Sequence, residues 1–222
     1  MDPDLRRAWT QIVTPEDYEA HMASIGQAQA SAELARHLIR AACLAPNSRI
    51  VIVGAGTGQM FDFIDPAIFR PHRLTCTDLN PSFLTQLRKR LGKHGLAAEI
   101  LADDIEQTAL APDSDLLMAT LLLEHINWRC GVAALSRLKP RTCAIIIQEN
   151  PPDISSAVTP GRRLPPSIEK AVETAHPVLV PRDELLEAME TASYALRDTA
   201  VREVADGKKL VSLLYDRLPG QP

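Results

Sequence analysis

The sequence has few aromatic residues, no long apolar run and no paired cysteines. Aromatic residues make up 4% of its 222 residues, and the longest apolar stretch is residues 116–123, which contains Thr120. A membrane-spanning helix needs about 20 apolar residues, so we expect none. The N-terminal residues also lack an apolar stretch of the signal-peptide type, and we therefore expect a cytoplasmic location.

Cysteine spacing and charge exclude further classes. No CxxC pair and no cluster with histidine occurs among Cys43, Cys76, Cys130 and Cys143. We therefore expect neither a structural zinc site nor a disulfide framework. The chain has 24 Lys and Arg against 28 Asp and Glu, a net charge of −4. Nucleic-acid binding requires positive charge to neutralise phosphates, so we expect no such partner.

Buried strands alternate with amphipathic helices along most of the chain. The strand candidates are residues 49–53, 73–78, 98–101, 115–120 and 142–148. Strands that alternate with helices predict a parallel sheet with helices on both faces. Two more strand-like runs, near residues 194–204 and 209–218, flank Ala205-Asp206-Gly207, a sequence typical of a hairpin turn. The expected fold is a doubly wound α/β sheet of seven strands, mostly parallel, with a C-terminal antiparallel hairpin.

The segments outside this alternation are expected to cap it. Residues 1–48 are predicted to form an N-terminal helical cap over a domain of residues 49–222. One helix starts at Thr14-Pro15, a hydroxyl cap followed by proline in the first turn. Residues 151–166 are rich in Pro, Ser and Arg and are predicted to be a loop. Within it, residues 160–163 (PGRR) are either solvated or contact an anionic acceptor group.

A glycine-rich turn follows the first buried strand. Gly54, Gly56 and Gly58 allow a sharp turn and a close approach of the backbone to a ligand. The dinucleotide fingerprint GxGxxG would need its third glycine at Gln59, so a nicotinamide dinucleotide is disfavoured. We expect a helix to begin at about Gln59. The alternative is a tight turn without a ligand.

Acidic residues end the next two strands. Asp78 lies 20 residues after Gly58 and either accepts hydrogen bonds from a ribose diol or caps the helix that begins at Pro81. Asp103 and Asp104 compete for the exocyclic amine of adenine, and Asp104 is preferred. In open α/β sheets, ligands bind at the carboxyl ends of the strands, where these residues are expected to meet.

Together, these motifs resemble those of the class I S-adenosylmethionine-dependent methyltransferases. The similar segments are VIVGAGTG (51–58), TDLNP (77–81), LADDIE (101–106), DLLMATLLLEHI (115–126) and LKPR (138–141), within residues 49–218. The resemblance implies a Rossmann-like fold and S-adenosyl-L-methionine as cofactor. It implies cofactor contacts from Gly54, Ala55, Gly56, Gly58, Asp78, Leu79, Asp103, Asp104, Ile105 and Thr120. Many members carry an acid near the first glycine, where this chain has valines. Backbone carbonyls of Gly54 and Thr120 are therefore expected to hold the methionine amino group.

The resemblance implies methyl transfer by in-line displacement, in which the protein supplies position and electrostatics. A base is needed only where the acceptor loses a proton. The candidates are His125, Glu149, His21 and Tyr18. His125 is either a base with a pKa near neutrality or a residue that fixes the loop. Tyr18 and His21 either contact the cofactor and acceptor or pack over the sheet edge.

The expected acceptor is a small molecule, and we expect no metal ion. A homodimer is compatible with the sequence. One alternative is a non-catalytic cofactor-binding protein on a degenerate methyltransferase fold. Another is a protein or RNA methyltransferase, although residues 49–222 leave little room for a separate recognition domain.

Overall fold

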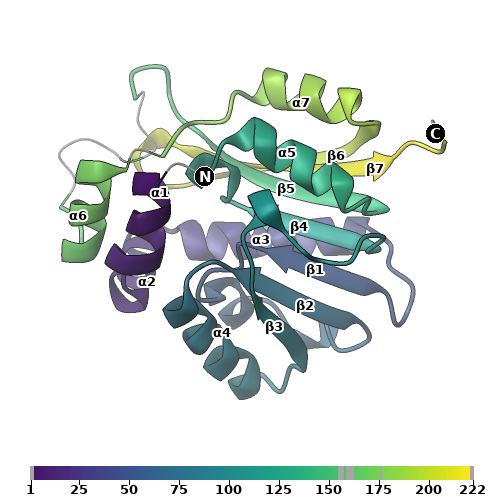
Figure 1. The fold of residues 1–222 in the computed structure, drawn as a ribbon, viewed down its shortest axis with the longest axis horizontal. Helices are drawn as coiled ribbons and strands as arrows, with labels where there is room; N and C mark the ends of the chain where they lie inside the picture. The colour runs from purple at the N-terminus through teal and green to yellow at the C-terminus, as the bar shows by residue number, and fades with distance from the viewer. Residues whose placement is uncertain (1–2, 155–157, 159–162, 176, 221–222) are drawn as a thin grey trace.

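The computed structural model describes residues 3–154, 158, 163–175 and 177–220. Seven strands form one sheet in the order β3-β2-β1-β4-β5-β7-β6 (Figure 1). β7 runs antiparallel to both its neighbours, and the other strands share one direction. The strands are β1 (Arg49–Val53), β2 (Arg73–Asp78), β3 (Ala98–Ala102), β4 (Leu116–Thr120), β5 (Thr142–Glu149), β6 (Tyr194–Glu203) and β7 (Lys209–Arg217). The predicted Rossmann-like α/β fold with its closing hairpin is confirmed.

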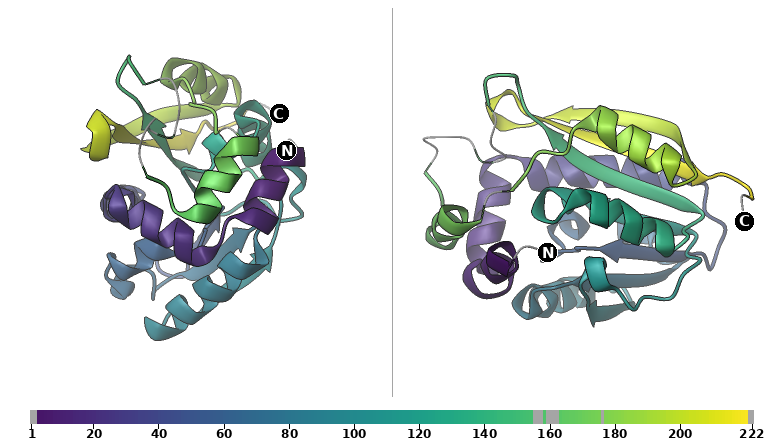
Figure 2. Two further views of the ribbon diagram at one scale, coloured as in Figure 1. Left: turned by 90° about the vertical axis from the view of Figure 1, so that its left-hand side faces the viewer. Right: turned by 45° about the horizontal axis from the view of Figure 1, so that its top comes forward.

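Helices cover both faces of the sheet because its central strands are apolar on both faces. Ile50 and Ile52 pack in one core with α3 (Gln27–Ala41) and α4 (Pro81–Lys93). Val51 and Val53 pack in a second core with α5 (Trp128–Arg137) and α7 (Arg182–Thr191), which lie on the same side of the sheet (Figure 2). No helix in the described ranges is long and apolar enough to cross a membrane.

The N-terminal helices divide between two places. α3 belongs to the layer that covers the sheet, because Leu34 and Leu38 are fully buried in the same core as β1. α1 (Pro3–Arg7), the π-helical η1 (Ala8–Ile12) and α2 (Pro15–Ser24) lie together at one side of the molecule (Figure 1). The predicted helix start at Thr14 is confirmed, since its side chain accepts a hydrogen bond from the Asp17 amide at 3.3 Å. The domain division at residue 48 stays a prediction.

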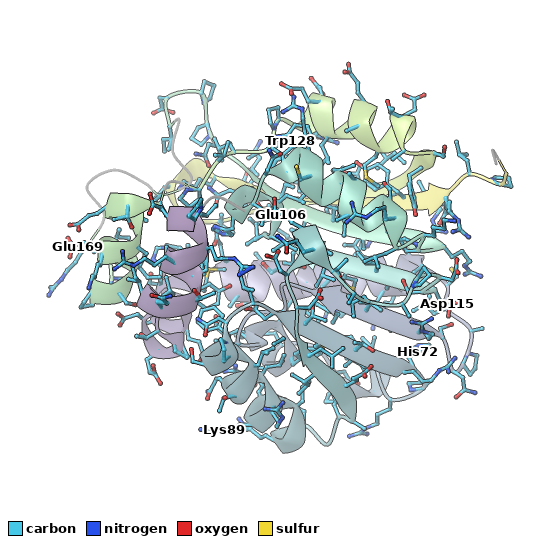
Figure 3. The ribbon with its side chains drawn as sticks, in the orientation of Figure 1. His72, Lys89, Glu106, Asp115, Trp128 and Glu169 are labelled. Atoms are coloured by element: carbon cyan, nitrogen blue, oxygen red, sulfur yellow. The ribbon has the colours of Figure 1, made fainter. Side chains whose placement is uncertain are left out.

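A helix that the sequence analysis did not predict completes this side. α6 (Pro166–Thr174) packs beside η1 and α2 (Figure 2). Its residues Ile168 and Ala171 are buried in a third apolar cluster with Leu5 and Val13, whereas Glu169 points outward (Figure 3). Of the predicted PGRR segment, Arg163 is exposed and residues 160–162 lie outside the described residues.

The helix expected from Gln59 is the main error in the predicted elements. Two short 3-10 helices stand there, η2 (Gln59–Asp62) and η3 (Pro66–Ile68). Asp65 separates them, with its side chain accepting a hydrogen bond from the Ala67 amide at 2.9 Å. Proline at position 66 lacks the amide that a continuous helix would need there. Among the described residues, no long helix follows the glycine turn directly, so other contacts hold the turn in place.

Gly58→Ala is expected to lower the free energy of unfolding by about 2–4 kcal/mol, combining backbone strain with overpacking. Gly58 has a φ of +74°, and a Cβ there would clash with the buried Leu87 side chain and approach Phe61 to 3.1 Å. Gly26 is a matched control, because its φ is +71° but nothing lies within 4 Å of an added Cβ. Gly26→Ala should cost only the strain, about 1–2 kcal/mol. Urea unfolding without ligand measures both, and equal losses would contradict the packing role of Gly58.

Candidate functional site

The glycine turn after β1 is fastened to the end of β2. The Ala55 amide donates to the Thr77 carbonyl and the Gly56 amide donates to Asp78 Oδ2, both at 2.8 Å. Asp78 Oδ1 accepts from the Asn80 amide at 2.8 Å. Burial raises the pKa of Asp78 above its ordinary value, and these amide hydrogen bonds oppose that rise. The carboxylate therefore shapes the turn besides facing the site.

A cavity of about 170 Å³ opens at the carboxyl ends of the strands, between the glycine turn and the N-terminal helices. Most of the predicted site residues line it: Gly54, Gly56, Asp78, Leu79, Asp103, Asp104, Ile105, Thr120, Tyr18, His21 and His125. Ala55, Gly58 and Glu149 lie outside its lining. Gly58 is needed for packing against Leu87. Glu149 forms an ion pair with Arg182, with 3.9 Å between Oε1 and Nη1. Glu149 therefore does not face the crevice where the sequence analysis placed it.

The two acids after β3 differ in their contacts. Asp104 forms an ion pair with Arg6 of α1, and its Oδ1 accepts from the Glu106 amide at 3.1 Å. Asp103 Oδ1 accepts from the Ala109 amide at 3.4 Å, whereas its buried Oδ2 has no hydrogen-bond partner among the described residues. Asp103 thus carries the open acceptor atom, although the sequence analysis preferred Asp104. The assignment of an adenine contact to either acid stays a prediction.

An aromatic cluster forms the roof of the cavity. Trp9 of η1 contacts His125 edge to face, with ring centroids 4.4 Å apart, and lies 6.0 Å from the Tyr18 ring. Burial lowers the pKa of His125 to about 4, so the prediction of a pKa near neutrality is wrong. His125 is neutral at pH 7 and too weak a base for efficient proton transfer there. Burial, with the Asp78 charge second, raises the pKa of Tyr18, which stays protonated at neutral pH.

Glu124 is a site residue that the sequence analysis did not select. It lies in the 3-10 helix η5 (Leu123–His125), is 3% exposed and lines the cavity. Burial raises its pKa to about 7, against hydrogen bonds from the backbone. The signal was the Glu-His pair after β4, but only the histidine was considered. Its burial depends on distant elements, so local sequence could not reveal it.

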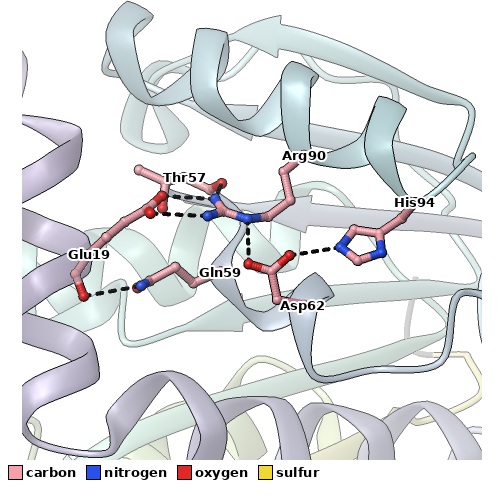
Figure 4. Close-up of polar contacts among 6 residues, drawn as sticks. All are labelled: Glu19, Thr57, Gln59, Asp62, Arg90 and His94. Carbon is pink, nitrogen blue, oxygen red and sulfur yellow. Dashed lines mark hydrogen bonds and ion pairs between the residues drawn. The ribbon is translucent and has the colours of Figure 1, made fainter.

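A charged network ties the roof to the glycine turn (Figure 4). Arg90 of α4 donates to both carboxylate oxygens of Glu19 on α2, at 2.8 and 3.0 Å. Its Nε donates to Asp62 Oδ2 at 2.9 Å, and its guanidinium also donates to the Thr57 carbonyl inside the glycine turn. Asp62 in turn lies 2.7 Å from His94 Nε2. One side chain thus joins α2, α4, η2 and the turn.

The cavity suits an adenosyl cofactor better than a metal ion. Gly56 lines the cavity at a φ of +58°, and a Cβ there would face Tyr18 at 3.5 Å. Asp103 and Thr120 line the same cavity, and each carries a buried oxygen atom, Oδ2 and Oγ1, without a hydrogen-bond partner among the described residues. Such acceptors fit the amine and hydroxyl donors of an adenosine group. In the described part of the chain, no three His, Cys, Asp or Glu side chains are placed to hold a metal ion.

Comparisons with known proteins agree with this geometry. Residues 50–141 match the family model described as a methyltransferase domain. Magnesium protoporphyrin IX methyltransferase from Synechocystis PCC 6803, solved with bound S-adenosylmethionine, superposes with a TM-score of 0.63 at 12% identity. The match covers 96% of this chain and 89% of that one. No curated protein matches the sequence.

Two further solved structures show how varied the chemistry on this fold is. Geranyl diphosphate C-methyltransferase from Streptomyces coelicolor A3(2) superposes with a TM-score of 0.61 at 12% identity, covering 83% of this chain and 78% of that one. The [4+2]-cyclase SpnF superposes with a TM-score of 0.61 at 14% identity, covering 84% and 82%. At these identities the likeness shows the fold.

Asp62→Asn is expected to lower the free energy of unfolding by about 1 kcal/mol at pH 7, because the Arg90 network loses its charged acceptor. Burial alone would raise the pKa of Asp62, but the hydrogen bond from His94 and the Arg90 charge outweigh it and hold the pKa below its ordinary value. The carboxylate therefore stabilises the fold fully above its unfolded pKa and loses this effect as the pH falls through the folded pKa. Urea unfolding of both proteins at a series of pH values should show the difference shrinking below about pH 4. A difference that stays constant down to pH 3 would contradict the role of the charge.

Proposed function

We propose that this chain methylates a small-molecule acceptor in the cytoplasm. The premise is that residues 50–141 match a methyltransferase domain and that the fold is that of the class I S-adenosylmethionine-dependent methyltransferases. The observation that supports a small acceptor is the roof over the cavity. α1, η1, α2 and α6 all contribute lining residues, among them Leu5, Trp9, Met22 and Ile168. A ligand enclosed in this way has to be small.

The chain's own residues would bind and orient the reactants. The turn at Gly54 and Gly56 lets the backbone approach the cofactor closely, and Asp78 with Asp103 supplies acceptor oxygens for its hydroxyl and amine groups. S-adenosylmethionine supplies, when bound, a methyl group activated on a sulfonium. The apolar roof excludes water, which strengthens the electrostatic contacts inside the site.

A second candidate is a cofactor-binding protein that does not transfer a methyl group. The observation that favours it is the structural likeness to SpnF, which is a [4+2]-cyclase. A protein or RNA acceptor is less well supported, because such a substrate would have to reach a cavity covered by helices, and the net charge is −4. A homodimer stays an expectation from the sequence.

Calorimetric titration should show micromolar binding of S-adenosylmethionine and S-adenosylhomocysteine, and none of NADH. Asp78→Ala should bind both adenosyl ligands at least about tenfold more weakly than the wild type. The reason is that hydrogen bonds to the cofactor and to the Gly56 amide, worth at least about 1.4 kcal/mol, are lost. Urea unfolding of the variant controls for misfolding, and Asp198→Ala on β6 is a remote control that should bind normally. Failure of both adenosyl ligands to bind the wild type would overturn the proposal.

Catalysis is tested separately from binding. The protein is incubated with S-adenosylmethionine carrying an isotope-labelled methyl group and a mixture of small metabolites, and mass spectrometry follows the label. Transfer to a small molecule supports the methyltransferase function. Binding without transfer to any component of a broad mixture favours the non-catalytic candidate.

A further inference from the structure

We propose that Glu124 takes up the proton that the methyl acceptor loses, and that the acceptor is a mainly apolar compound that presents one ionisable hydroxyl group. This inference rests on the proposed function, because it assigns a role to a residue in the same cavity. It names a base that neither the glycine turn nor the acids after β2 and β3 provide.

The Glu124 side chain has one oxygen held and one oxygen open. Oε1 accepts a hydrogen bond from the Gln148 amide at 2.7 Å, which fixes the carboxyl group against the end of β5. Oε2 is buried and has no hydrogen-bond partner in the part of the chain that the structure describes. A buried polar atom without a partner is costly, and Glu124 is one of the residues that line the cavity, so the carboxyl group indicates a ligand donor there.

The order of the strands places Glu124 on the acceptor side of the cavity. β1 and β2 carry the glycine turn and Asp78, whereas Glu124 follows β4 and is held by β5. β4 lies directly between β1 and β5, so the carboxyl group follows the strand next to the one that carries the glycine turn. Gln27 reinforces its support, donating to Gln148 Oε1 at 2.6 Å.

Besides Glu124 and His21, five titratable groups line the cavity, and they are less suited to this task. They are Tyr18, Asp78, Asp103, Asp104 and His125. Tyr18 stays protonated and His125 is a weak base, as shown above, while Asp78 and Asp104 are engaged by backbone amides and by Arg6. Asp103 follows β3, separated from β4 in the sheet by β2 and β1. Glu124, whose pKa burial raises to about 7, is matched to proton transfer near neutral pH.

The remaining lining indicates what else the acceptor carries. Apolar side chains from the roof and from the segment after β4 contribute much of the cavity lining, among them Met22, Ile25, Ile126, Ile168 and Val172. Arginine and lysine are missing from the described lining, so an anionic acceptor has no counter-charge there. An apolar body with one hydroxyl matches both features.

The proposed step transfers a methyl group to the acceptor oxygen and a proton to Glu124. The acceptor oxygen forms a bond to the methyl carbon while the carbon–sulfur bond breaks, and the electron pair of that bond stays on sulfur. The hydroxyl proton passes to Glu124 Oε2, which changes from carboxylate to carboxylic acid. The carboxyl group releases the proton to solvent after the product leaves, which restores the base.

The test uses Glu124→Gln, which keeps an oxygen for the Gln148 amide but cannot take up a proton. The matched control is Glu187→Gln, which neutralises an exposed acid on α7 outside the cavity lining. The probe ligands are 2-naphthol and its methyl ether, which differ only at the oxygen under study. Calorimetry measures the binding of each probe to the protein saturated with S-adenosylhomocysteine, and methyl transfer from S-adenosylmethionine to 2-naphthol is followed from pH 5 to pH 10.

We expect the wild type and Glu187→Gln to bind 2-naphthol at least about tenfold more tightly than the ether, which corresponds to one hydrogen bond to a charged acceptor. Glu124→Gln should lose this preference while it binds S-adenosylhomocysteine as tightly as the wild type. Its transfer rate should fall about 100-fold or more at pH 7, since general-base assistance contributes about 10²–10⁴-fold. The rate should recover at a pH where the naphthol ionises without help, which a merely structural role of Glu124 would not produce.

Other outcomes would overturn the inference. If Glu124→Gln weakens the binding of S-adenosylhomocysteine instead, the carboxyl group holds the cofactor. If neither probe binds, or if the preference for naphthol survives in the variant, the assignment of the acceptor class or of the base is wrong. Absence of S-adenosylhomocysteine binding to the wild type would instead count against the proposed function itself.

Discussion

The partly buried carboxylate of Asp78 is the constraint on which the site depends. A charged group at this depth is tolerated only where hydrogen bonds compensate for lost water. Backbone amides of Gly56 and Asn80 supply them, each at 2.8 Å. Because one of these donors belongs to the glycine turn and the other begins α4, a single side chain sets the spacing between β1, β2 and the helix that follows. The glycines of the turn have positive φ angles in this geometry.

The roof of the cavity is attached through polar contacts from the same region. Asn80 caps α4 and donates to the Trp9 carbonyl at 2.7 Å, while Arg90 joins Glu19 of α2 to the Thr57 carbonyl. Arg6 adds an ion pair to Asp104. Apolar packing with α6 completes the cover. Polar contacts thus attach the roof to the strand ends that carry the predicted cofactor residues.

Much of the fold was predictable because its signals are local. The apolar strands, the Asp-Gly hairpin turn and the helix starts at Thr14-Pro15 and Pro81 each depend on neighbouring residues alone. Most of the observed elements begin and end within a few residues of the predicted ones. The errors occurred where local preference was weak. The helix expected at Gln59 is interrupted by Asp65-Pro66, and α6 follows a Pro-rich segment whose apolar face becomes significant only against Leu5 and Val13.

The sequence by itself determined the order of strands and turns along the chain. With it, the sequence determined the placement of Gly56, Asp78, Asp103 and Asp104 at the carboxyl ends of parallel strands. Chain direction and strand alternation suffice for that. Only the tertiary structure decided the chemistry of Glu124 and His125. These residues are neighbours in the chain, yet burial moves one pKa up to about 7 and the other down to about 4. Their protonation depends on desolvation by η1, α2 and β5, elements far away in the sequence, and no local pattern records that environment.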